Sequence, residues 1–290
     1  MHKTNRKRGA FAIWTALCLA CVPARAQELF EPSIHWAYAS YFGTGWYKLN
    51  DRQSAFIFKT APRWTIGESG FDDDGGRSIQ YTLRLPLTIG LSQLSFDDIP
   101  GSVDPGNLAT LSAGISFDAD VPVTERFSVR PNVEVGYGGV IGEDDRAWSY
   151  RASMRGRFAF EPERFDWALI FDGGFVGYDA SGPGRDRFSF ASIAAEFTHP
   201  VQWFRSSGGQ SLFHWHIKHA SFPDRVRVEK GPGEFDVLRD YWEAGAAIGR
   251  RDEPIRLWFL RFDRLGLAYS ASSSSQLRGV RLVFRSQYEL

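Results

Sequence analysis

The chain has 290 residues, of which 43% are hydrophobic, 15% aromatic and 23% charged, and its formal net charge is zero. A nucleic-acid partner would need a basic surface, so none is expected. Both cysteines, Cys18 and Cys21, lie near the N-terminus. The rest of the chain therefore holds no disulfide framework and no thiolate metal site.

Residues 1–26 are typical of a cleaved secretory signal. A basic stretch is followed by an apolar run of 12 residues, Phe11–Val22, which is too short to span a bilayer as a helix. Pro23 ends the run, and Ala24-Arg25-Ala26 fits the cleavage rule, so Gln27 is predicted to start the mature chain. Residues 27–290 then carry 29 basic and 34 acidic side chains, a net charge of −5.

Residues 27–290 alternate apolar and polar side chains in about twelve segments, which indicates β-strands. In Arg187–Thr198 the alternation changes phase, so a β-bulge is expected there. Ile255–Ser270 is either one long strand with a break near Phe262 or two short strands. The predicted strands are Ser33–Tyr47, Ser54–Ile66, Ser78–Gly90, Leu108–Asp118, Arg126–Gly138, Ala147–Phe160, Phe165–Tyr178, Arg187–Thr198, Ser211–Ser221, Leu238–Gly249, Ile255–Ser270 and Gln276–Leu290.

These segments favour an all-β fold, a transmembrane antiparallel up-and-down β-barrel of about twelve strands. Most are 11–14 residues long, which exceeds the strands of soluble proteins and suits a tilted crossing of a bilayer. The bilayer offers no hydrogen-bond partners, so the sheet must close on itself. Placing both termini in the periplasm puts long connections such as Leu91–Asn107 and Phe222–Val237 outside the cell.

The two faces of the strands predict what each side of the barrel contacts. In the last strand Val280, Leu282 and Phe284 would face lipid, while Arg281 would face the lumen. Opposite charges would then cross a narrow, largely occluded lumen. A small-solute channel remains an alternative if these side chains leave a gap. The predicted luminal charges are Arg84, Arg130, Glu134, Arg151, Arg155, Asp166, Asp172 and Arg281.

The alternating final strand, Gly279–Leu290, resembles the closing strand of bacterial outer-membrane barrels, and the size resembles an autotransporter translocator domain. Only Gln27–Pro32 precede the first predicted strand, so the best resemblance is to solitary autotransporter-like barrels without a passenger. This resemblance implies a non-enzymatic protein of the bacterial outer membrane without a cofactor. It implies outer-membrane lipid, lipopolysaccharide and the barrel-assembly machinery as partners.

Ser211–Ser221 supports a second hypothesis. Phe213, Trp215 and Ile217 alternate with His214, His216 and Lys218, so His219 and Ser221 continue the lipid-facing row. A histidine two residues from a serine on one face could generate an alkoxide nucleophile.

This pair resembles the His-x-Ser of outer-membrane phospholipase A and the lipid A deacylases, which implies a lipid hydrolase with catalytic His219 and Ser221. Those enzymes usually have Asn after the serine, where Phe222 stands here. Asp240, Glu234 or Asp236 are the candidates to orient His219, and we favour Asp240.

Other polar motifs are expected to be structural. His214 and His216 share a face, but no third ligand is evident, so no metal site is predicted. The stretch Phe71–Gly76 lacks the spacing of a calcium loop. The acidic groups Asp97–Asp98 and Glu143–Asp145 mark loop tips that could bridge divalent ions to lipopolysaccharide.

Overall fold

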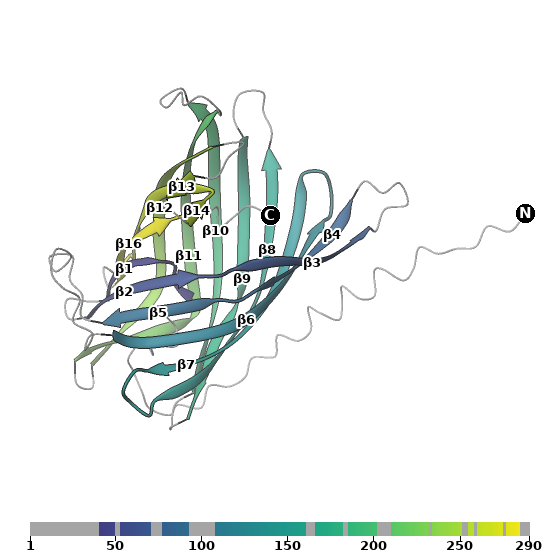
Figure 1. Ribbon diagram of the computed structural model, residues 1–290. Coiled ribbons are helices and arrows are strands. Elements are labelled where there is room, and N and C mark those ends of the chain that lie inside the picture. The colour runs from purple at the N-terminus through teal and green to yellow at the C-terminus, as the bar shows by residue number, and fades with distance from the viewer. Residues whose placement is uncertain are drawn as a thin grey trace, which may run out of the picture. The chain divides into compact units, whose positions relative to one another are not determined.

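A computed structural model describes residues 41–49, 53–70, 77–92, 108–160, 166–181, 185–201, 210–231, 234–250, 255–257, 260–274 and 277–284. Predictions for residues 1–26, 33–40, 71–76, 97–98 and 285–290 therefore lie outside the described residues. Nearly all the described residues are in strands (Figure 1). The strands are β1 Gly45–Leu49, β2 Gln53–Thr60, β3 Arg63–Gly70, β4 Ser78–Arg84, β5 Leu87–Ser92, β6 Leu108–Pro122, β7 Phe127–Val140, β8 Arg146–Phe160, β9 Asp166–Ala180, β10 Arg185–Val201, β11 Ser211–Gly231, β12 Glu234–Arg250, β13 Ile255–Leu257, β14 Leu260–Phe262, β15 Arg264–Ala271 and β16 Leu277–Val283.

One antiparallel sheet closes on itself and forms a barrel with twelve wall positions, as predicted. Successive wall positions pair with each other, β6 pairs with β7, and β1 pairs with β16 to close the ring, while β13 and β14 pair in a separate hairpin. The wall order is β1, β2 continued by β3, β4 continued by β5, β6 to β12, β15 and β16. Closure pairs the strand edges that a bilayer could not satisfy.

Two prolines divide the predicted strands Ser54–Ile66 and Ser78–Gly90. The pairing register is the same on both sides of the breaks, so β2 and β3 occupy one wall position and β4 and β5 the next. Pro62 and Pro86 have no N–H for the ladder. Their carbonyl oxygens instead accept hydrogen bonds from the N–H groups of Leu85 (3.0 Å) and Gly114 (2.9 Å).

Two of the predicted boundaries are wrong. Among the described residues the first strand begins at Gly45, and Tyr41–Thr44 are not in a strand, although the Thr44 carbonyl oxygen still accepts a hydrogen bond from Leu282 N–H at 2.8 Å. Residues 222–237 are not simply a loop, since the β11–β12 ladder resumes after a bulge and continues to Gly231 and Glu234. The predicted break near Phe262 is confirmed, since β14 ends at Phe262 and β15 begins at Arg264; before the break, β13 and β14 pair as a short hairpin.

The bulge predicted in Arg187–Thr198 is also wrong. β10 pairs with β9 and β11 without any register shift. The apparent change of phase arises because Phe188 and Phe190 are buried inside the barrel, whereas Ile193 on the other face is 45% exposed. Large apolar groups thus occupy both faces of this strand, and the strand stays regular.

Candidate functional site

The outward face of the wall is apolar and exposed. Its large hydrophobic side chains include Ile115 (60% exposed), Trp148 (57%) and Leu267 (56%). The next residue along a strand points the other way and is buried, as for Ser116 after Ile115. The predicted outward set Trp215 and Ile217 is confirmed, with His214 and His216 buried behind it. This arrangement is the reverse of a water-soluble protein, where large apolar patches are covered.

Aromatic rings gather near both ends of the strands on this outward face. Toward one end, Phe160 stacks on Trp167 with centroids 3.7 Å apart, and Phe197 stacks on Trp215 at 4.0 Å. Toward the other end, Trp148 packs on Tyr137 at 5.0 Å. On β8, Trp148 and Phe158 are ten residues apart, which corresponds to about 25 Å along the axis of a tilted strand. Aromatic belts with this separation bound the apolar band of a membrane barrel.

The inward face carries ion pairs, and those between β10 and β16 are fully buried. Glu243 lies at the centre of one network: its Oε1 is 2.6 Å from Arg281 Nη2 and 3.0 Å from His216 Nε2. Ser270 Oγ donates to Glu243 Oε2 at 3.0 Å. Beside it, Arg264 Nη1 donates to Glu196 Oε1 at 2.5 Å. The four charged side chains of these two salt bridges are at most 10% exposed, so water scarcely screens them.

Glycines on β12 make room for this network. A Cβ at Gly245 would lie 2.4 Å from His216 Cε1 and 2.7 Å from Ala268 Cβ, and one at Gly249 would lie 3.0 Å from His214 Nε2. The imidazole rings therefore occupy the space that a side chain at these two positions would fill. Thr198 Oγ1 and His214 Nδ1 are hydrogen bonded at 2.8 Å, which fixes the second ring.

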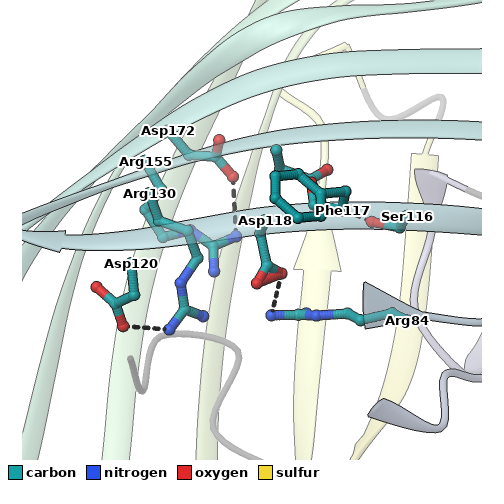
Figure 2. Close-up of polar contacts among 9 residues, drawn as sticks. Arg84, Ser116, Phe117, Asp118, Asp120, Arg130, Arg155 and Asp172 are labelled. Atoms are coloured by element: carbon teal, nitrogen blue, oxygen red, sulfur yellow. Dashed lines mark hydrogen bonds and ion pairs between the residues drawn. The ribbon is translucent and has the colours of Figure 1, made fainter. Parts of the chain in front are cut away.

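A second set of ion pairs lies between β2 and β9, and it is more accessible. Figure 2 shows Arg84 directed at Asp118, Arg130 at Asp120 and Arg155 at Asp172. The corresponding N–O distances are 2.5, 2.8 and 3.0 Å. In addition, Arg151 Nη2 lies 3.6 Å from the same Asp172 Oδ2, and Lys59 Nζ lies 3.9 Å from Glu134 Oε1.

An apolar cluster fills the interior at the end that carries the β9–β10 and β11–β12 connections. It contains Tyr178, Phe188, Phe190, Phe222 and Tyr241, with Tyr41 packed against it. The Tyr41 ring meets Phe190 edge-on at 5.2 Å and lies 5.9 Å from the Arg151 guanidinium carbon. Burial raises the pKa of Tyr41 well above its ordinary value, so its hydroxyl stays protonated. The Tyr41 side chain, just before β1, thus lies in the interior, where the sequence had predicted a wall strand.

Several luminal charges were predicted and several were not. Arg84, Arg130, Glu134, Arg151, Arg155, Asp172 and Arg281 all take part in the inward ion pairs, whereas Asp166 is exposed at the first position of β9. The prediction missed their partners. The signal for Asp118 and Asp120 was present, because they continue the buried alternate row Thr110 and Ser116 of β6. The missed residues are Lys59, Asp118, Asp120, Glu196, Glu243 and Arg264.

The predicted catalytic residues share the outward face near the β15–β16 connection. His219 Nε2 lies 3.7 Å from Asp240 Oδ2, and Ser221 is the register partner of Asp240. Asp240 Oδ1 also accepts hydrogen bonds from the N–H (3.3 Å) and hydroxyl of Ser273. Both Ser221 and His219 belong to the described part of the chain, and no hydrogen bond joins them there. The geometry brings together two of the three residues.

The other polar candidates are clusters of possible metal ligands and the acidic turn Glu143–Asp145. Within the described ranges, no three His, Cys, Asp or Glu side chains are placed to hold a metal ion. Glu143–Asp145 form the turn between β7 and β8. There Arg146 Nη1 donates to the carbonyl oxygens of Val140, Glu143 and Asp145.

Comparison with known proteins identifies the fold. No protein-family model matches the chain, and no curated protein sequence matches it. Among solved structures, the β domain of the Bordetella autotransporter BrkA matches with a TM-score of 0.53 and 10% sequence identity. The match covers 82% of this chain and 92% of the BrkA domain. At this identity the likeness shows a common fold, the closed antiparallel barrel. No helix among the described residues has the length and hydropathy of a membrane span.

Proposed function

We propose that the mature chain is a non-enzymatic β-barrel of the bacterial outer membrane, similar to an autotransporter translocator domain, with a charged and largely occluded lumen. The proposal rests on how side chains are distributed across the wall, which is the reverse of the distribution in a water-soluble protein. Side chains such as Ile115 and Leu267 are exposed outward, while Asp118 (1% exposed) and Glu243 (4%) are buried inward. Lipid is the solvent that favours this distribution, because each exposed apolar side chain gains free energy in it.

The interior supports the occluded lumen. The apolar cluster with Tyr41 packs inside the barrel at the end that carries the β9–β10 and β11–β12 connections. Salt bridges such as Arg281–Glu243 link inward side chains of different strands. The alternative, a small-solute channel, requires a continuous aqueous path. Planar-bilayer recordings separate the two, since discrete unitary conductance steps would contradict the occluded lumen.

The membrane location is tested by expressing the chain with its N-terminal signal in a Gram-negative host. We expect the protein in the outer-membrane fraction, with an electrophoretic mobility that changes on boiling. A lipid-face substitution, Ile217→Lys, should impair insertion, because a lysine facing lipid costs about 2–4 kcal/mol at the midplane. Ile217→Val is the matched control. A wild-type protein that remains monomeric in water without detergent would refute the proposal.

A second candidate function, hydrolysis of outer-leaflet lipid, is favoured by one observation, the proximity of His219 and Asp240 on the outward face. Here Ser221 would be the nucleophile, His219 its base and Asp240 the residue that orients the imidazole. Purified protein should then release fatty acid from phospholipid or lipid A, and Ser221→Ala should abolish release. Ser69→Ala serves as the control, because Ser69 lies on β3 opposite Ile79, away from these three residues. Turnover that survives Ser221→Ala removes this candidate.

A further inference from the structure

The ion pairs between β2 and β9 do not expose their two partners equally. The Arg84 side chain is 30% exposed, while its partner Asp118 is 2% exposed. Arg151 and Arg155 are 20% and 21% exposed, while the Asp172 that they share is 10% exposed. At these two sites the carboxylates are recessed in the wall and the guanidinium groups are accessible. The exposures are similar in the Lys59–Glu134 pair (20% and 16%) and reversed in the Arg130–Asp120 pair (9% and 15%), so Arg130 is not part of the accessible group.

The cations also converge from three wall positions: the adjacent positions of β2 and β4, and the more distant β8. Lys59 on β2 lies within electrostatic range of Arg84 on β4 and Arg151 on β8, and Arg84 lies within range of Arg155. One carboxylate, Asp172, serves two guanidinium groups, so these three groups together carry one excess positive charge. Like charges held together at a partly accessible surface repel one another, and a bound anion relieves that repulsion.

We propose that this part of the inner wall, formed by Lys59, Arg84, Arg151 and Arg155, binds a small oxyanion with two or more negative charges. Guanidinium groups present paired N–H donors that match phosphate and carboxylate oxygens, and an ammonium group adds a point charge. The two salt bridges between β10 and β16 offer no such surface, because Arg264 and Arg281 are 5% and 6% exposed. The inference rests on the proposed function in one respect: the face must line the inside of a barrel.

The test uses the purified full-length mature barrel in a zwitterionic detergent and inorganic pyrophosphate as the probe. Calorimetric titration is done against sodium chloride at matched ionic strength, which removes nonspecific screening. We expect saturable binding by the wild type. Arg151→Gln should weaken it about tenfold, because one charged donor is lost while Arg155 keeps Asp172 paired.

Two further variants test whether pyrophosphate binds at this group of cations. Asp172→Asn should tighten binding, since it removes the carboxylate that competes with the anion. Arg278→Gln should leave binding unchanged, because Arg278 is exposed outside this cation group, as the last β16 partner of β15. The proposal is overturned if the wild type does not bind pyrophosphate, or if Arg151→Gln and Asp172→Asn bind it as the wild type does. Boiling-dependent mobility on the same preparation reports the barrel separately, so a folded barrel that does not bind refutes only this inference.

Discussion

The two halves of the inner wall use the same ion-pair chemistry in different surroundings. Between β10 and β16, Glu243 and Arg281 are 5% and 6% exposed and share further hydrogen bonds with His216 and Ser270. Between β2 and β9, Arg155 keeps 21% of its side chain accessible beside Asp172. Desolvated charges depend on their partners, whereas partly hydrated ones have water as an alternative. The first half is therefore expected to hold the barrel together, and the second to contact solutes.

The largest expected loss of stability comes from a substitution in the buried half, between β10 and β16. Glu243→Gln leaves Arg281 and its neighbours without a counter-charge, so the free energy of unfolding should fall by about 3–5 kcal/mol. Urea unfolding of the barrel in lipid vesicles measures this. Combining Glu243→Gln with Arg281→Met should recover part of the loss, since the orphaned charge is gone. A single-variant loss below about 1 kcal/mol would remove the distinction between the halves.

A smaller loss is expected from filling the space under His216. In Gly245→Ala the new methyl group would lie 2.4 Å from the ring, so the imidazole must move away from Glu243. We expect a loss of about 1–3 kcal/mol by the same unfolding measurement. Gly70→Ala is the control, because nothing lies within 4 Å of a Cβ there. Equal stability of the two variants would show that the ring is not tightly held.

Arg155→Gln measures the loss of stability in the more accessible half, between β2 and β9, for comparison with Glu243→Gln. Asp172 keeps Arg151 at 3.6 Å, and water reaches the site, so the loss should be about 1 kcal/mol or less. Unfolding in vesicles again gives the value. A loss as large as that of Glu243→Gln would mean that this half is as tightly coupled as the other.

The smallest expected effect is that of ionic strength on the coupling energy of the ion pairs. Raising the ionic strength from about 0.1 M to about 1 M shortens the screening length from roughly 10 Å to 3 Å. The coupling between Arg155 and Asp172, taken from a double-mutant cycle, should therefore shrink, while that between Arg281 and Glu243 should change little. Equal salt sensitivity of both couplings would contradict the assignment of one half as buried.

Period-two patterning predicted the barrel and the faces of most strands, because apolar side chains outside and charged side chains inside reverse the usual distribution consistently. It placed Trp215 outward and Arg281 inward, as observed. It failed where apolar groups pack inside: Phe188 and Phe190 in the interior cluster produced a false bulge. Nor did alternation predict that Tyr41 leaves the wall, since its partners Phe190 and Phe222 are distant in sequence.

The candidate site was predicted only in part. Arg281 was placed in the lumen, but its partner Glu243 lies on a strand separated from it by β15. Which two side chains meet in this way depends on the shear of the barrel, a global property that local spacing does not carry. His219 and Asp240 were expected to share a face because their strands are neighbours along the chain, and they do.

The stacked rings of Phe160, Trp167, Phe197 and Trp215 cross four consecutive strands through direct register partners. A slip of one residue in any of these pairings would turn a ring away from its neighbours. The indole chromophores therefore acquire a fixed chiral environment only when β8 to β11 are in register. The near-ultraviolet circular dichroism of this protein should appear when β8 to β11 pair and later than its far-ultraviolet β signal, so it reports the assembly of this part of the wall.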